Sequence, residues 1–340
     1  MNLPTDMKKT KTYGIVLTLL MVLLAGSCLL FGSVHIPCSE VIGILAGQTP
    51  TNESWAFIVL QSRLPQTLTA LLCGASLAAS GLMLQTVFNN PLADPSILGI
   101  SSGANLGVAL VLLVGGGMAS FGTTLLAALV GAMLVMGIIL LLSGFIKSNV
   151  MLLIAGIMIG YLISSAISLL NFLATSEGVH SFIIWGMGNF GGVDMERLPW
   201  FSVVCLAGLL MAVSLVKPLD ALLLGPRYAE NLGINLRLTR SLLLLATGLL
   251  TAVTTAFCGP VAFIGLAVPH VARLLSGSSN HHALMPITML CGAVVALLCN
   301  LICMLSGDGG MIPLNVVTPM FGAPVILFVI MNQKKIQYFN

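Results

Sequence analysis

The chain has 340 residues, of which 58% are hydrophobic and only 7% are charged. A soluble domain carries about 25% charged residues, so this composition excludes a water-soluble protein and indicates a membrane protein. The formal charge of +3 is too small to indicate a nucleic-acid partner. The apolar runs are continuous, whereas the strands of a membrane β-barrel alternate with a period of two, so helices are expected.

Ten apolar segments approach or exceed the length of about 20 residues that a helix needs to cross a bilayer. In chain order we expect spans at residues 13–32, 64–86, 95–114, 118–142, 149–174, 198–216, 238–257, 259–275, 284–305 and 315–332. The first follows lysines, as in a signal peptide, but it is long enough to span and we expect it to be retained. The predicted fold is all-α and polytopic, with a single transmembrane domain over residues 1–340.

The distribution of basic residues indicates the orientation of the chain. If the N-terminus lies in the cytoplasm and ten spans follow, all but two of the 13 lysines and arginines fall in inner segments. The two exceptions are Arg63 and Arg197. Inner loops of membrane proteins are enriched in Lys and Arg, and the opposite orientation would invert this count. We therefore expect both termini in the cytoplasm.

Two of the connections between spans are predicted to contain short helices. In the inner segment 217–237, Pro218 and Pro226 are each suited to open a short helix, and Gly225 and Gly233 are each suited to close one. Two short helices at the cytoplasmic face would form a docking surface for a partner. An ordinary solvated loop is the alternative. The outer segment 175–197 is apolar around Trp185 and predicts a short helix at the membrane interface.

The sequence lacks the residues of the common catalytic and metal-binding motifs. It contains no glycine-rich phosphate loop for ATP, no catalytic cluster and no paired Cys-x-x-Cys. Ionisable residues inside the spans are almost absent, although ion-coupled carriers commonly rely on them; Asp94 and His270 come closest. The adjacent His281 and His282 have no third ligand at metal spacing, so a solvated inner loop is expected there. We expect no enzyme activity and no metal site.

Several blocks of the sequence resemble one family of transporters. They are Arg63-Leu64-Pro65, residues 74–104 with Asn90-Pro91-Leu92-Ala93-Asp94-Pro95 near the centre, Trp185-Gly186-Met187-Gly188, the inner segment 217–237, residues 259–273, and Gly322-Ala323-Pro324. In this order they resemble the FecCD-type permeases of ATP-binding-cassette importers, which carry ferric siderophores, haem and cobalamin. The resemblance covers essentially the whole chain from about Arg63 onward.

The resemblance implies the type II importer permease fold in a bacterial inner membrane. It also implies a homodimer surrounded by membrane lipid, two copies of an ATPase subunit that bind the ATP and Mg, and an extracytoplasmic substrate-binding protein; no cofactor is implied in this chain. The inner loop would couple to the ATPase through Gly225, Arg227, Ala229, Glu230 and Gly233. In such permeases the fifth and tenth spans line the translocation path, which here would include Tyr161, Ser164, Ser165, Ser168, Asn171 and Thr318.

The chain departs from the family pattern at its outer charges. Gln66 and Met304 stand where the family usually has arginines, Asn300 replaces an aspartate, and Met311 replaces a glutamate. Only Arg63 then remains for docking the binding protein. The alternative is docking through the outer acidic residues Asp194, Glu196 and Asp308.

The residues do not identify the cargo. We expect an ATP-driven permease for a ferric siderophore, with cobalamin (vitamin B12) or haem as alternative cargoes. Two different classes of protein remain as rivals: a secondary transporter driven by an ion gradient, and a polytopic membrane enzyme.

Overall fold

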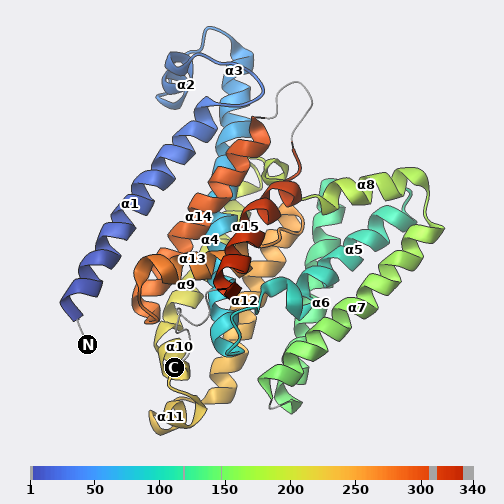
Figure 1. The fold of residues 1–340 in the computed structure, drawn as a ribbon. Coiled ribbons are helices and arrows are strands. Elements are labelled where there is room, and N and C mark those ends of the chain that lie inside the picture. The colour runs from blue at the N-terminus through green and yellow to red at the C-terminus, as the bar shows by residue number, and fades with distance from the viewer. Residues whose placement is uncertain (1–2, 118, 147, 306–311, 332–340) are drawn as a thin grey trace.

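All regular structure in the described part of the chain is helical. A computed structural model describes residues 3–117, 119–146, 148–305 and 312–331, and Figure 1 shows their arrangement. Ten helices correspond one to one with the predicted spans: α1 (Leu3–Leu30), α4 (Leu64–Val87), α5 (Ile100–Val114), α6 (Phe121–Phe145), α7 (Asn149–Leu173), α9 (Leu198–Ser214), α12 (Leu236–Cys258), α13 (Ile264–Ser276), α14 (His281–Met304) and α15 (Leu314–Met331).

Shorter elements connect the ten helices. They are α2 (Cys38–Leu45), α3 (Glu53–Phe57), the π-helix η1 (Ile58–Arg63), the 3₁₀ turns η2 (Pro95–Leu98) and η3 (Phe190–Gly192), α8 (Ser176–Gly186), α10 (Val216–Leu223) and α11 (Pro226–Asn231). Helix α8 is the predicted outer helix that contains Trp185. Helices α10 and α11 are the two short helices predicted for the inner loop, so the solvated-loop alternative is wrong.

Within the described residues, six helices meet the length and hydropathy of a membrane span on their own, and α9 does so together with α10, from which it is bent by 46°. The apolar helices α5, α13 and α15 are shorter. Two predicted spans begin later as helices than the sequence indicated. Residues 95–98 form a 3₁₀ turn that ends at Gly99, where φ is 77°, and α13 begins after Phe263, where φ is 68°.

The second span begins earlier than predicted. Helix runs without a break from Glu53 to Val87, a length of 35 residues. Pro65 has no N–H to donate to the carbonyl of Gln61, and the turn before it widens to a π-helix. There the Leu64 N–H donates to the Val59 oxygen, five residues back. The proline therefore changes the local hydrogen bonding without ending the helix.

Helices α4, α12 and α14 form the centre of the bundle. In the most apolar 18-residue stretch of the span that ends with α4, 83% of the residues are buried. In the corresponding stretches of α1 and α7 only 17% of the residues are buried. Glycines allow the central helices to pack closely: a Cβ added to Gly74 of α4 would lie 2.2 Å from the Gly292 oxygen of α14. A Cβ added to Gly81 would lie 1.8 Å from the Gly265 oxygen of α13.

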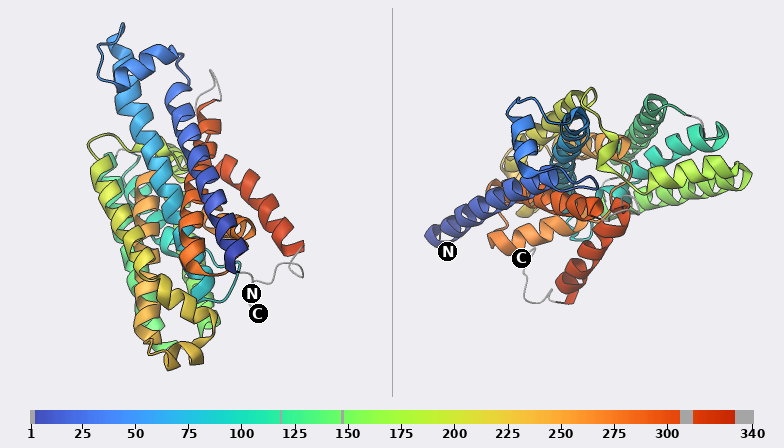
Figure 2. Two further views of the ribbon diagram at one scale, coloured as in Figure 1. Left: turned by 90° about the vertical axis from the view of Figure 1, so that its left-hand side faces the viewer. Right: turned by 90° about the horizontal axis from the view of Figure 1, so that it is seen from above.

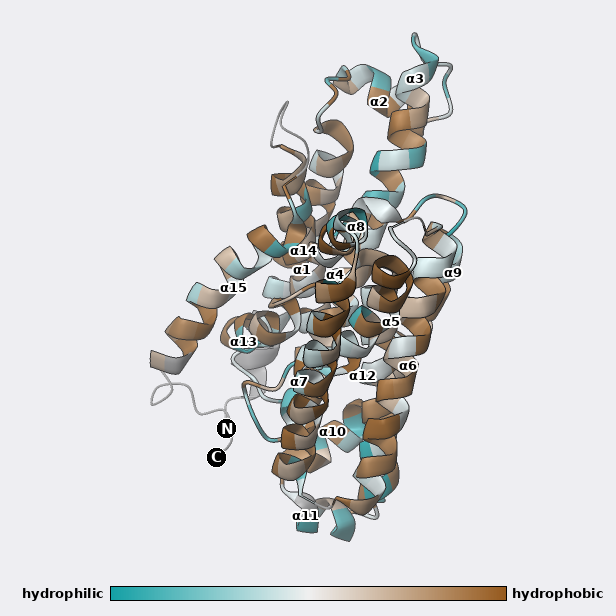
Figure 3. Ribbon diagram, turned by 90° about the vertical axis from the view of Figure 1, so that its right-hand side faces the viewer, coloured by the Kyte–Doolittle hydropathy of each residue, from teal (hydrophilic) through white to brown (hydrophobic). Residues whose placement is uncertain are grey.

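The outer surface of the bundle is apolar between two polar ends. Large apolar side chains are exposed along the peripheral helices, for example Leu141 on α6, Phe172 on α7 and Trp200 on α9. Polar residues gather instead at the α2–α3 end and around α11 (Figure 3). An apolar belt of this extent requires lipid or another protein surface. Helix α1 begins and α15 ends away from the α2–α3 end (Figure 2), as an even number of spans requires.

Candidate functional site

The tip formed by α10 and α11 protrudes from the bundle at the end opposite to α2 and α3 (Figure 1). Gly225 joins the two helices with a φ of 98°, and Gly233 follows α11 with a φ of 81°. Both values are in a region that glycine adopts readily and side chains rarely do. Pro226 occupies the first turn of α11, where its missing N–H costs nothing. Local sequence therefore determines the shape of this tip.

The predicted coupling residues divide into exposed and buried groups. Arg227 and Glu230 are exposed, whereas Ala229, on the inward face of α11, is fully buried. Three apolar side chains that the sequence analysis did not single out are also exposed here: Leu224 at 61%, Tyr228 at 67% and Leu232 at 65%. Large apolar groups that are exposed among charges, beyond the apolar belt, indicate a surface for a protein partner.

Asp220 of α10 connects the tip to the bundle. Its carboxylate accepts hydrogen bonds from the backbone N–H and from Nδ1 of His281, at 2.6 and 2.8 Å. The other ring nitrogen, Nε2, lies 2.8 Å from Oγ1 of Thr86 on α4. Because an ionised carboxylate only accepts, Nδ1 of His281 carries a proton. Three helices thus meet in one chain of hydrogen bonds.

This contact corrects the interpretation of the two adjacent histidines. His281 is only 1% exposed and is the first residue of α14, so it does not lie in a solvated loop. Partial burial raises the pKa of Asp220, but the hydrogen bonds and charge of His281 outweigh it and hold that pKa below its ordinary value of 3.8. In the described residues no group of three or more His, Cys, Asp or Glu side chains could hold a metal ion.

Three of the positions expected to depart from the family charge pattern meet where α4 and α14 lie nearest to the α2–α3 end. Nε2 of Gln66 donates to Oδ1 of Asn300 at 2.9 Å, and Nδ2 of Asn300 lies 3.4 Å from the Met304 sulfur. Both amides are buried. Three substitutions that appear separate in the sequence therefore form one neutral, hydrogen-bonded cluster. Met311 lies outside the described residues.

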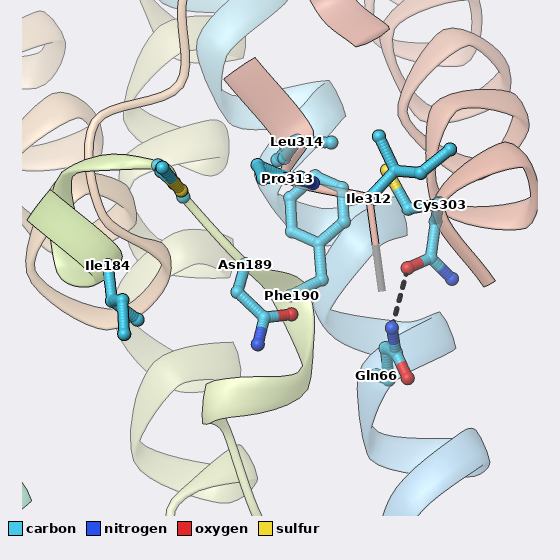
Figure 4. A pocket seen from close by; sticks show the side chains of 11 residues that line it. Gln66, Ile184, Asn189, Phe190, Cys303, Ile312, Pro313 and Leu314 are labelled. Carbon is cyan, nitrogen blue, oxygen red and sulfur yellow. Dashed lines mark hydrogen bonds between the residues drawn. The ribbon is translucent and has the colours of Figure 1, made fainter. Parts of the chain in front are cut away.

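A cavity of about 240 Å³ lies beside this cluster (Figure 4). Figure 4 shows Gln66, Phe190 and Pro313 around this cavity, and its dashed line marks the hydrogen bond from Gln66 to Asn300. The walls come from α4, α14, the segment after α8 and the segment before α15. The cavity is therefore bounded by the two central helices on one side and by α8, the start of α15 and their adjoining segments on the other.

Arg63 lies inside the fold and not on an open surface. It is only 2% exposed, and its guanidinium donates to the Leu29 and Leu30 carbonyls at 2.9 and 3.0 Å, and also to the carbonyl of Val34. These bonds hold the end of α1 against the second span. A docking role for Arg63 stays a prediction, and it would require the side chain to leave these carbonyls.

The predicted path residues on α7 are mostly exposed. Tyr161, Ser164, Ser165 and Ser168 lie on the surface of this peripheral helix. The hydroxyl of Ser168 donates to the Ser164 carbonyl at 2.9 Å, as serines in membrane helices commonly do. Thr318 of α15 is only 3% exposed, so it does not lie on the open face in this conformation.

A cavity of about 520 Å³ lies between α7 and α15, the two helices predicted to line the path. Asn105, Asn171 and Asn315 contribute to its lining, from α5, α7 and α15 respectively. Nδ2 of Asn315 donates to the Gly186 and Pro260 carbonyls at 3.0 and 2.6 Å, so this residue holds the α8 and α13 connections together. No local pattern in the sequence marks Asn315, because its partners are more than 50 positions away. The path role of Asn171 stays a prediction.

The fold defines an all-helical polytopic membrane protein with a protruding tip formed by α10 and α11. Comparison with known proteins identifies its family: residues 17–332 match the FecCD transport family, and the chain belongs to that family. It is 37% identical over 322 residues to the vitamin B12 import system permease protein BtuC of Klebsiella pneumoniae, which covers 95% of this chain and 93% of that protein. It is 36% identical to the BtuC protein of Salmonella typhi over 277 residues, which cover 82% of this chain and 84% of that protein.

A solved structure confirms the predicted fold. The chain matches a structure described as an inward-facing conformation of a metal-chelate type ABC transporter with a TM-score of 0.83 and 32% identity, covering 95% of this chain and 99% of that one. The PsaBC structure from Streptococcus pneumoniae shares the fold at 17% identity, with a TM-score of 0.51 over 78% of this chain and 90% of that one. The chain is therefore a permease subunit and not an enzyme; in ABC importers a partner ATPase hydrolyses the ATP.

Proposed function

We propose that this permease imports a corrinoid of the vitamin B12 type, driven by a partner ATPase that binds the α10–α11 tip. Two relatives that match most of the chain at 36–37% identity are named vitamin B12 import permeases. The comparisons thus favour the alternative cargo over the ferric siderophore that the sequence analysis expected. A ferric siderophore and haem are kept as test cargoes.

The observation that carries the coupling to an ATPase is the exposed surface of the tip. Leu224, Tyr228 and Leu232 present apolar area beside the charged Arg227 and Glu230. Aromatic and arginine side chains are enriched where protein interfaces are strongest. The rigid turns at Gly225 and Gly233 hold these groups in place, which lowers the entropy lost on binding.

The exposed face of α7 supports a path shared between two copies of the chain. Figure 2 shows, in the view from above, that α7 and α15 diverge from the bundle on either side of an open face. Hydroxyl-bearing residues of α7 are exposed among apolar ones, although lipid gives no partner to a hydroxyl. A second copy across this face would enclose them in a channel. Small hydroxyls would let a bulky solute pass without binding it tightly.

The proposed orientation places α10 and α11 in the cytoplasm and the α2–α3 end outside. The outer surface then presents exposed carboxylates, including Glu53 and Glu196. Asp194 is paired with Arg197 at 2.9 Å, and Asp308 lies outside the described residues. Because Arg63 is buried and Gln66 is neutral, we propose that the binding protein meets this face with lysine or arginine side chains.

Uptake into lipid vesicles tests the cargo. The chain would be reconstituted with its ATPase, supplied with its binding protein, and offered cyanocobalamin, a ferric siderophore or haem in parallel. ATP-dependent accumulation of cyanocobalamin alone supports the proposal. Accumulation of haem or the siderophore instead would contradict the cargo and leave the ATP-driven permease intact. A complex that hydrolyses ATP but moves none of the three would place the cargo outside this group.

A further inference from the structure

Helices α4 and α14 behave as one body because their backbones touch. A Cβ on Gly74 would lie 2.2 Å from the Gly292 oxygen, and a Cβ on Gly292 would lie 2.3 Å from the Gly74 oxygen. Packing this close leaves no room for the helices to slide independently. Gln66 and Asn300 join the same helices again at the outer end, at 2.9 Å. We call this unit the α4–α14 pair.

At its inner end the α4–α14 pair packs against α10, whose Val216 and Leu219 belong to the hydrophobic core, and one polar connection adds to this apolar contact. Asp220 of α10 binds His281 of α14, which in turn lies against Thr86 of α4. Elsewhere a cavity of about 810 Å³ separates the tip from the bundle, with Glu230 and Gly225 on one wall and Ser143 and Asn149 on the other. Movement of α11 therefore has a route to the α4–α14 pair through α10, by its apolar packing and by the hydrogen bonds of Asp220, beside the direct connection of α11 to α12.

The carboxylate of Asp220 does more than cap a helix. The side chain of Asn280 already caps α14 by accepting from the His282 N–H at 2.8 Å. Asp220 is an additional acceptor, and it comes from a helix 61 positions away in the sequence. A buried histidine that bridges a carboxylate on one helix and a hydroxyl on another fixes the relative position of all three helices.

We propose that Asp220 is a positioning residue that transmits movement of the docking tip, through His281 and Thr86, to the α4–α14 pair. The pair then changes the walls of the outer cavity beside Gln66 and Asn300. This inference rests on the proposed function, because it requires that an ATPase moves the tip. It adds a defined mechanical connection between the ATPase side and the outer side of the permease.

Cys303 offers a native reporter for this movement. It lies on α14, lines the outer cavity and is 6% exposed. Its alkylation by a membrane-impermeant maleimide would be followed in the reconstituted complex, with and without ATP plus vanadate. All measurements would use a Cys38→Ser variant, because Cys38 is an exposed thiol that would also react. The additional substitution Cys303→Ser would measure the labelling that does not come from Cys303. Trapping nucleotide with vanadate should change the rate of Cys303 alkylation about tenfold. A change of this size is expected when a conformation populated at about 10% becomes the dominant one.

The proposal predicts that in Asp220→Ala the nucleotide-dependent change in the rate of Cys303 alkylation falls to less than about twofold, because the populations of the two conformations then change little. Assembly with the ATPase and basal ATP hydrolysis should persist, so the cargo moved per ATP should fall. Asp220→Asn retains an acceptor oxygen for His281 and should retain most of the change. Thr86→Val, similar in shape but without the hydroxyl, should fall between them. Glu177→Ala is the control, because Glu177 is an exposed carboxylate that takes no part in the hydrogen bonds of Asp220, His281 and Thr86.

A full nucleotide-dependent change in a folded Asp220→Ala complex would overturn the inference while leaving the proposed function intact. Equal loss in Asp220→Asn and Asp220→Ala, accompanied by an equal fall in melting temperature, would assign Asp220 a purely structural role and would also overturn it. If the ATPase fails to bind the parent chain, the proposed function itself fails. The melting temperature of each variant separates these outcomes from loss of folding.

Discussion

The α4–α14 pair and helix α7 have similar apolar compositions and opposite environments. The pair is buried at the centre, touches backbone to backbone at Gly74 and Gly292, and ends at the neutral cluster of Gln66 and Asn300. Helix α7 lies at the periphery, with exposed residues on most of its surface. The difference teaches that hydropathy identifies spans but does not distinguish a central helix from a peripheral one.

The sharpest test of this difference is to add one methyl group to a glycine in each region. Gly74→Ala places a Cβ 2.2 Å from a backbone oxygen, so α4 and α14 must separate. We expect the free energy of unfolding to fall by about 3 kcal/mol or more, so that little folded protein is obtained. Gly160→Ala on α7 meets its nearest atom at 3.5 Å and should be neutral or slightly stabilising. Yield and melting temperature in detergent measure both; equal behaviour would refute the rigid centre.

A second test separates folding from coupling at the docking tip. At Gly233, φ is 81°, so Gly233→Val strains the backbone by about 1–3 kcal/mol at the end of α11. We expect a folded membrane protein whose ATP-dependent uptake is abolished. Gly233→Asn tolerates the same backbone conformation and should retain most of the uptake. Normal uptake by Gly233→Val would remove this loop from the coupling mechanism.

The exposed face of α7 can be tested by the bulk of a side chain. We expect Ser164→Trp to reduce uptake severalfold without changing the melting temperature, because the residue is exposed in one copy and faces the proposed path between two. Leu162 is 73% exposed and lies two residues earlier, about 200° around the helix. Leu162→Trp is the matched control and should transport normally. Equal loss in both would show that bulk on either side of α7 impairs uptake, and would contradict a path specific to the Ser164 side.

The hydrogen bonds between Asp220 and His281 predict a dependence of stability on pH. The pKa of Asp220 is lowered in the folded state, so its contribution to stability is full above its ordinary value of 3.8 and is lost as the pH falls through the folded value. The difference in melting temperature between the parent and Asp220→Ala should therefore shrink as the pH falls below 3.8. A difference that grows on acidification would contradict the assignment of the ionised carboxylate.

The smallest expected effect concerns the outer surface. Glu53→Lys and Glu196→Lys should each weaken docking of the binding protein by up to about fivefold, since exposed charge pairs contribute about 0.2–1 kcal/mol. The loss should diminish at high salt. Ser279→Lys, an exposed residue at the opposite end, is the control. Binding to nanodisc-embedded complex measures the effect, and tighter docking by the lysine variants would indicate an acidic partner instead.

Much of this fold was predictable because its signals are local. Apolar runs marked all ten spans, and the Pro226 and Gly225 pattern predicted the α10–α11 tip, since turn residues act within a few positions. The contacts between distant residues could not be predicted in this way. His281 appeared solvated beside His282, and its burial depends on Asp220 and Thr86. The proximity of Gln66 to Asn300 likewise depends on how the glycines pair α4 with α14.

The most direct test of the account is the energy source of transport. Vesicles that contain the chain with its ATPase would be compared with vesicles that contain the chain alone, each supplied with the binding protein and cyanocobalamin. The account predicts accumulation only when the ATPase and ATP are both present, and none with an ATPase that cannot hydrolyse ATP. Accumulation by the chain alone under an imposed proton or sodium gradient would contradict it and would indicate a secondary transporter.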